Sequence, residues 1–135
     1  MMDRDSSKKQ LTAWKFAPAI ICFCLVLFLI CLPEDSLPDK HSWLDITYLD
    51  KFVHAIMFAT MTFLFLLPIA ESNMYQKVKR HYFIRICISA CIWGLATEFI
   101  QKYYVPSRSF DIFDWVADSA GITIAWIYCR KFHRR

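Results

Sequence analysis

The chain has 135 residues, a formal net charge of +4 and a hydrophobic content of 57 %, with only two glycines. This length leaves room for one domain, but the apolar residues come in long blocks, which argues against a small soluble domain. The 16 basic residues are spread between these blocks instead of forming one patch, which argues against binding to nucleic acid. The composition therefore indicates a protein of the lipid bilayer.

Four apolar blocks approach or reach the roughly 20 residues that a helix needs to cross about 30 Å of hydrocarbon. We expect transmembrane helices over residues 14–32, 48–69, 82–104 and 110–129. The connections are short, so residues 14–129 are predicted to form one all-α domain, an integral membrane bundle of four helices. A polar arm, residues 1–13, precedes this domain, and a basic tail, residues 130–135, follows it.

The basic residues predict the orientation of this bundle. Twelve of the 16 lie in the amino-terminal arm, the middle loop and the tail, counted with their flanks, and four lie around the first and third loops. By the positive-inside rule, both termini and the middle loop are cytoplasmic, and the first and third loops face outward. The basic tail is then explained by topology and contact with lipid headgroups.

The first block and the cysteines predict structural roles. The first block starts with basic residues, as a signal peptide does, but no small-x-small cleavage site follows, so we expect an uncleaved anchor. All six cysteines lie within the apolar blocks or at their ends, and none forms a CxxC pair. We expect them to pack as small apolar side chains.

The second block opens with a polar group at its predicted outer end. Thr47 and Asp50 resemble a capping box, which predicts that the helix starts at Tyr48 after an outward loop. Asp50 and His54 are four residues apart and share a helix face, with Lys51 beside them. A single histidine near a helix end is more often structural than functional. Here Asp50 precedes it and further polar groups reach the same depth, so His54 is also a candidate ligand or general base.

The third block carries its carboxylate on a stripe of small residues. Ala90, Gly94 and Glu98 recur every four residues, and Gln101 shares the face of Glu98. Small residues let helices approach closely in lipid, so we expect this face to point into the bundle. The connection over residues 105–109 is short, which predicts that the third and fourth helices are antiparallel neighbours.

The fourth block repeats this arrangement with three carboxylates. Asp111, Asp114 and Asp118 follow one another at spacings of three and four, and Gly121 and Ala125 continue the stripe. An ionisable residue within a transmembrane segment is by default a candidate functional residue. Asp111 alone has a structural alternative, because carboxylates stabilise the first turn of a helix. Asp118 lies about two turns in and needs a partner, a proton or water.

Three motifs resemble those of a known family. DKFVH at residues 50–54, EFIQ at residues 98–101 and VPSRSFDIFDWVADSAG at residues 105–121 occur in this order. They resemble the DKxxH, ExxQ and P-G-R-S-x-D-x-x-D-x-x-A-N-x-x-G motifs of the VanZ-like family. This family of small bacterial membrane proteins is named for a protein associated with resistance to the glycopeptide teicoplanin.

The resemblance implies a multi-pass protein of the bacterial cytoplasmic (inner) membrane with a site made of the motif residues. The positions carried over are Asp50, Lys51, His54, Glu98, Gln101, Arg108, Asp111 and Asp114. Two positions depart from the family pattern. Ser107 stands where glycine is usual, which predicts a less tight turn before Arg108, and Asp118 stands where asparagine is usual, which adds a negative charge.

The predicted topology brings all of these residues to the outer side, although their helices run in different directions. Five acids face Lys51 and Arg108, so full ionisation would leave an excess of negative charge. Such an excess in a buried pocket requires protons, water or a bound cation. We therefore include Asp118 among the ligand-binding candidates and a divalent cation among the candidate cofactors.

Two functional hypotheses follow. In the first, the pocket binds or modulates a cell-envelope molecule, such as a lipid-linked peptidoglycan precursor or a glycopeptide, with Lys51 and Arg108 on its phosphate or carboxylate groups. In the second, the protein is an intramembrane hydrolase or transferase acting on a lipid headgroup. His54 is then the general acid or base, Asp50 orients it, and Glu98, itself a candidate catalytic residue, holds a divalent metal with Asp114.

Two further alternatives remain open. The charged residues can serve only as a salt-bridge network that holds three helices in register, although buried ion pairs are weak evidence of net stability. A transporter needs internal repeats or broken helices at mid-depth, and neither is visible here. A transport pathway would therefore require a homo-oligomer.

Overall fold

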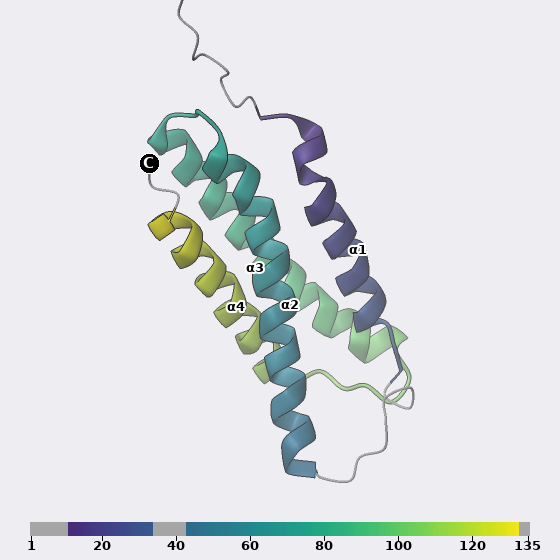
Figure 1. Cartoon of the computed structure of the whole chain (residues 1–135). Helices are drawn as coiled ribbons and strands as arrows, with labels where there is room; N and C mark the ends of the chain where they lie inside the picture. The colour runs from purple at the N-terminus through teal and green to yellow at the C-terminus, as the bar shows by residue number, and fades with distance from the viewer. Residues whose placement is uncertain (1–10, 34–42, 133–135) are drawn as a thin grey trace, which may run out of the picture.

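The computed structural model describes residues 11–33 and 43–132, and these parts of the chain are helical without any strand. A short 3-10 helix precedes four α-helices (Figure 1). The elements are η1 Ala13–Phe16, α1 Ala17–Ile30, α2 Trp43–Glu71, α3 Gln76–Tyr104 and α4 Ile112–Phe132. The prediction of an all-α protein is confirmed.

Three stretches are long and apolar enough to cross a membrane: Ala13–Ile30, Tyr48–Glu71 and Gln76–Tyr104. They correspond to the first three predicted spans and indicate a membrane protein. The fourth helix, α4, is long enough but does not reach the same mean hydropathy, since it carries Asp114 and Asp118.

Two helices are longer than the apolar blocks predicted. Helix α2 is already formed at Trp43, so its predicted start at Tyr48, after an outward loop, is wrong. The cap expected from Thr47 lies outside the described side chains. Helix α3 begins at Gln76, six residues before its apolar block. Its first turns contain no glycine or proline to break a helix. Hydropathy marked the apolar part of each helix, and the helix extends beyond it.

Helix α2 is central and contacts η1, α1, α3 and α4. The start of α1, the connection between α2 and α3, and the end of α4 lie at one end of the bundle (Figure 1). The end of α1, the start of α2 and the connection between α3 and α4 lie at the other end. We call this second end the polar end, because the ionisable motif residues gather there.

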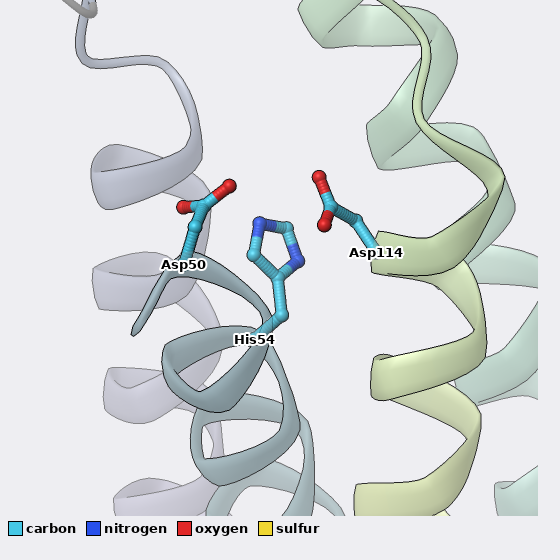
Figure 2. A group of neighbouring side chains, drawn as sticks. All are labelled: Asp50, His54 and Asp114. Carbon is cyan, nitrogen blue, oxygen red and sulfur yellow. The ribbon is translucent and has the colours of Figure 1, made fainter. Parts of the chain in front are cut away.

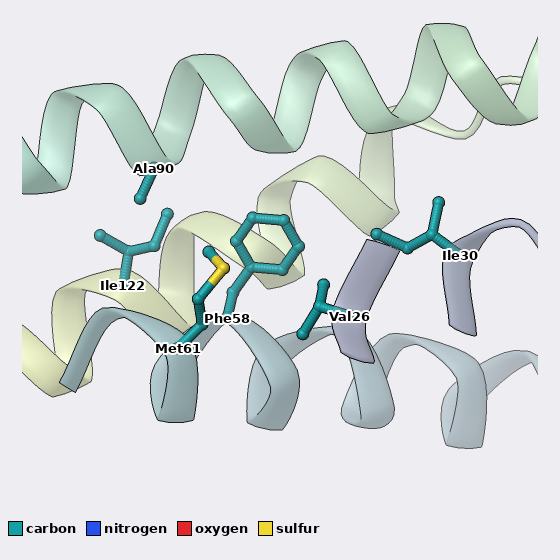
Figure 3. Packing of buried hydrophobic residues seen from close by; sticks show 6 residues of the cluster. All are labelled: Val26, Ile30, Phe58, Met61, Ala90 and Ile122. Atoms are coloured by element: carbon teal, nitrogen blue, oxygen red, sulfur yellow. The ribbon is translucent and has the colours of Figure 1, made fainter. Parts of the chain in front are cut away.

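Side chains from all four α-helices form the main apolar core (Figure 3). Its buried members are Val26, Ile30, Phe58, Met61, Ala90 and Ile122. Large apolar side chains also cover the outside of the bundle; examples are Ile21, Phe28, Phe52, Ile92 and Phe113. An apolar exterior around an apolar core is the arrangement that a lipid environment requires.

The two glycines explain how closely the helices approach. A Cβ atom on Gly121 of α4 would overlap the backbone oxygen of Ala55 in α2 and lie 3.0 Å from the nitrogen of Ala59. A Cβ atom on Gly94 of α3 would lie 3.0 Å from Asp118 Oδ2. The small stripes predicted on the third and fourth blocks therefore face the bundle, and they let polar side chains of α2, α3 and α4 meet.

Candidate functional site

Lys51 of α2 ties the start of α4 to the bundle. Its Nζ donates to Asp111 Oδ2 at 2.7 Å and to Asp114 Oδ1 at 3.0 Å. Asp111 lies just before α4, and its Oδ1 accepts from the backbone N–H of Phe113 at 2.8 Å, as a capping carboxylate does. Both roles considered for Asp111, capping and charge pairing, are thus present together.

His54 and Asp118 form a buried pair between α2 and α4. His54 Nδ1 lies 3.0 Å from Asp118 Oδ1, and the two side chains are 2 % and 0 % exposed. The predicted partner of His54 was Asp50, which shares its helix face. Asp50 and Asp114 lie on either side of the imidazole ring (Figure 2), and the hydrogen bond to the ring is made by Asp118. One of the two carboxylate oxygens of Asp118, Oδ1, therefore has a partner.

Glu98 brings α3 to the same place. The side chain is fully buried, and its Oε2 accepts from the backbone N–H of Asp111 at 3.1 Å. Two carboxylate oxygens of this cluster, Glu98 Oε1 and Asp118 Oδ2, are buried and accept no hydrogen bond from any described residue. A buried polar atom without a partner costs about 1–3 kcal/mol, and more when charged. These two oxygens therefore need a proton, water or a cation.

Gln101 and Arg108 extend the site toward α1. Gln101 is buried, and its Nε2 donates to the backbone oxygen of Ile30, at the end of α1, at 3.5 Å. Arg108 is half-buried, and its Nε has no hydrogen-bond partner among the described residues. Ser107, just before it, has a backbone φ of 66°. This is the left-handed conformation that glycine adopts without strain.

A cavity of about 210 Å³ opens at the polar end between α1, α2 and the α3–α4 connection. Its polar lining comes from Asp50, His54, Gln101 and Arg108. Its apolar lining comes from Leu29, Ile30, Leu32, Leu49, Val53 and Met57. Arg108 and the imidazole of His54 therefore border one cavity, whereas Lys51 does not line it.

Two groups of three residues have the donor types and spacing of a metal site. One group is Asp50, His54 and Asp114, and the other is His54, Glu98 and Asp118; within each, the donor atoms lie within 4.8 Å of one another. Glu98 and Asp114, the metal ligands expected under the enzyme hypothesis, fall into different groups. His54 belongs to both.

The nine predicted site residues thus lie at one end of the bundle, but in two parts. The Lys51 network occupies the α2–α4 side, and Arg108 and Gln101 lie on the side of α1. The sequence did not identify the last turn of α1 as a cavity wall. The last carbonyl groups of a helix lack partners within it and need donors from elsewhere, so a donor near the end of α1 could have been expected. The sequence does not indicate that this donor is Gln101 and that the acceptor is Ile30.

The fold and the site define an α-helical protein with three helices of membrane-spanning character and a buried polar cluster at one end. In comparisons with protein-family models, curated proteins and solved structures, no match to this chain was found.

Proposed function

We propose that the chain is a VanZ-like protein of the bacterial cytoplasmic membrane, with four spans, both termini in the cytoplasm and the polar end facing outward. One observation supports the resemblance and another supports the orientation. The three motifs meet at one end of the bundle, and the basic residues Lys79, Arg80 and Arg130 gather around a cavity near the opposite end. Basic residues are enriched on the cytoplasmic side of membrane proteins.

In this proposal the outward cavity binds the phosphate or carboxylate group of a cell-envelope molecule. The observation that carries this proposal is that Lys51 has acidic partners and Arg108 has none in the part of the chain that the structure describes. Lys51 is already paired with Asp111 and Asp114. Arg108 lines the cavity, its Nε has no hydrogen-bond partner, and it takes part in none of the ion pairs between described residues. A guanidinium group binds phosphate and carboxylate in a bidentate manner. Arg108, rather than Lys51, is the anion-binding residue.

The rest of the cavity suits a lipid-linked ligand. Its wall on the side of α1 is apolar and continues onto the exposed surface of α1, where Leu25 and Phe28 are 54 % and 62 % exposed. An acyl or prenyl chain can lie along this surface while its headgroup enters the cavity. Asp50 and Gln101 then offer acceptors and donors to the hydroxyl, amide or amine groups of a lipid-linked precursor or a glycopeptide, through which the protein alters glycopeptide susceptibility.

Binding of a polyprenyl monophosphate in lipid nanodiscs tests this function directly. We expect Arg108→Ala to weaken binding about tenfold or more, because hydrogen bonds to charged groups contribute about 1.5–3 kcal/mol. The control is Lys102→Ala, an exposed cation near the same end that does not line the cavity. In cells, Arg108→Ala should abolish an effect on teicoplanin susceptibility without lowering the amount of protein in the membrane. Equal binding by the wild type and Arg108→Ala rejects the proposal.

One observation favours a second candidate, an intramembrane hydrolase or transferase. His54 lines the cavity, and its Nδ1 is held by Asp118 at 3.0 Å, which is how a general base is oriented toward a substrate. Release of phosphate from the same lipid by the purified protein, lost in His54→Gln, would support catalysis. Binding without turnover would leave the first function alone.

A further inference from the structure

The position of Asp118 suggests a site below the cavity, deeper in the bundle. We propose that His54, Glu98 and Asp118 bind one divalent transition-metal ion, of the Zn²⁺ or Mn²⁺ class, at the junction of α2, α3 and α4. The three side chains are 2 %, 0 % and 0 % exposed. This site goes beyond the proposed anion binding, which rests on Arg108.

The unpartnered oxygens carry the argument. Glu98 Oε1 and Asp118 Oδ2 are buried without a hydrogen-bond donor from any described residue. Both carboxyl groups belong to the trio in which one donor atom of each residue lies within 4.8 Å of the others. A buried carboxylate that stays ionised must be paired or coordinate a metal. The ammonium group of Lys51 is directed to Asp111 and Asp114 and does not fill this need. One divalent cation would neutralise both carboxylates.

The donor types and the one known separation suit a transition metal. Two ligands at about 2.0–2.2 Å from a tetrahedral Zn²⁺ lie roughly 3.3–3.6 Å apart. His54 Nδ1 and Asp118 Oδ1, hydrogen-bonded at 3.0 Å, would need to separate by only a few tenths of an ångström to bind one ion. Imidazole suits zinc and related metals, and carboxylates suit Mn²⁺. Ca²⁺ would require six to eight oxygen ligands, more than these three side chains offer.

The surroundings hold the trio in place. The backbone N–H of Asp111 donates to Glu98 Oε2, an outer hydrogen bond of the kind that orients a metal-binding carboxylate. The missing side chain of Gly94 leaves room for Asp118 Oδ2, since a Cβ atom there would lie 3.0 Å from it. Phe58, fully buried, packs beside Gly94, so the neighbourhood of the trio on this side is apolar.

The neighbouring trio, Asp50, His54 and Asp114, has less need of a cation. Asp114 already accepts a hydrogen bond from Lys51 at 3.0 Å. Asp50 is half-exposed at the cavity and is therefore within reach of water. The inner trio, which contains two fully buried carboxylates, is the one that requires compensation.

Metal content of the purified full-length chain tests the site. The protein is stripped with a chelator in detergent, reloaded with Zn²⁺ or Mn²⁺, and analysed by elemental mass spectrometry after gel filtration. We expect one ion per chain. Glu98→Gln and Asp118→Asn should each weaken metal binding by at least the 10–100-fold that follows loss of even an outer hydrogen-bond partner, because both keep the size of the side chain and remove one ligand charge.

Two further variants make the result specific. Glu71→Gln, an exposed acid at the other end of α2, should retain the ion, and so should Asp50→Asn if the inner trio is the site. Loss of the ion in Asp50→Asn but not in Asp118→Asn would overturn the assignment. In the wild type, pulsed EPR of the Mn²⁺-loaded protein should show one directly bound nitrogen from His54. No stoichiometric ion, or no bound nitrogen, would overturn the proposal and leave protons as the partners of the two oxygens.

Discussion

Ser107 adopts a backbone conformation that side chains disfavour. Its φ of 66° lies in the left-handed region, which costs an L-residue about 1–2 kcal/mol. Glycine adopts it freely, but glycine loses about 0.5–1 kcal/mol through the greater freedom of the unfolded chain. The difference predicts that Ser107→Gly raises the free energy of unfolding by up to about 1.5 kcal/mol. The midpoint of thermal unfolding in detergent should rise accordingly.

Ser109 provides the matched control for this prediction. It is exposed, lies two residues further along the same connection and does not have a positive φ. Ser109→Gly should therefore leave the unfolding midpoint unchanged or lower it. A drop for Ser107→Gly similar to that of Ser109→Gly would show that the turn does not store this strain.

The contact between α2 and α4 depends on the absence of one side chain. In Gly121→Ala, the new Cβ would overlap the backbone oxygen of Ala55, so the two helices must separate. Alanine favours a helix over glycine by about 1 kcal/mol, but overpacking costs about 1–3 kcal/mol or more, and here the obstacle is backbone. We expect a net loss of stability in thermal unfolding, together with weaker metal binding because His54 and Asp118 lie across this contact.

Gly94 and Thr123 calibrate the effect. In Gly94→Ala, the new Cβ would lie 3.0 to 3.4 Å from side-chain atoms of Asp118 and Phe58. These side chains can shift by a few tenths of an ångström, so Gly94→Ala should lower the stability less than Gly121→Ala does. Thr123→Ala, on the exposed side of α4, should change stability by less than about 0.5 kcal/mol. Equal effects of Gly121→Ala and Thr123→Ala would show that the close approach is not required.

The elements show what the sequence can predict. Apolar blocks predicted all four α-helices, and the small stripes predicted which faces of α3 and α4 turn inward. Helix ends were less predictable, because residues 76–81 are mostly polar and still helical. The spacing of Asp50 and His54 predicted their shared face correctly. Asp118 is the hydrogen-bond partner of His54 because of the way α2 crosses α4. The residue spacing within one helix does not predict which residues of two helices pair.

At the scale of the whole molecule, the two ends differ in charge and chemistry. The polar end carries the buried acids and the cavity of about 210 Å³. Near the opposite end, a cavity of about 380 Å³ is lined by Lys79, Arg80 and Arg130. Lys79 is buried there, and its Nζ donates to the backbone oxygen of Ala70 at 2.8 Å. The basic residues near this end belong to the predicted middle loop and tail, whose positive charge indicated a cytoplasmic location.

Whether the chain crosses the membrane three or four times depends on whether α4 spans the bilayer. Its mean hydropathy is lowered by Asp114 and Asp118, but both are buried against the other helices. The surface that α4 exposes is apolar, with Val116, Ile124 and Ile127 each more than half exposed. A lipid-facing helix needs only an apolar exterior, so the two acids do not prevent α4 from spanning the bilayer.

Labelling of single cysteines tests this arrangement in intact cells, in a chain whose six native cysteines are replaced. With four spans, Ser109→Cys in the α3–α4 connection should react with a membrane-impermeant maleimide added outside. Asn73→Cys and Lys131→Cys should react only after the cells are opened, because the α2–α3 connection and the end of α4 are then cytoplasmic. If Lys131→Cys reacts from outside as readily as Ser109→Cys, α4 does not cross, and the carboxyl terminus is external. Reaction of Asn73→Cys from outside would instead reverse the orientation and place the Arg108 cavity on the cytoplasmic side, where it could not meet an external glycopeptide.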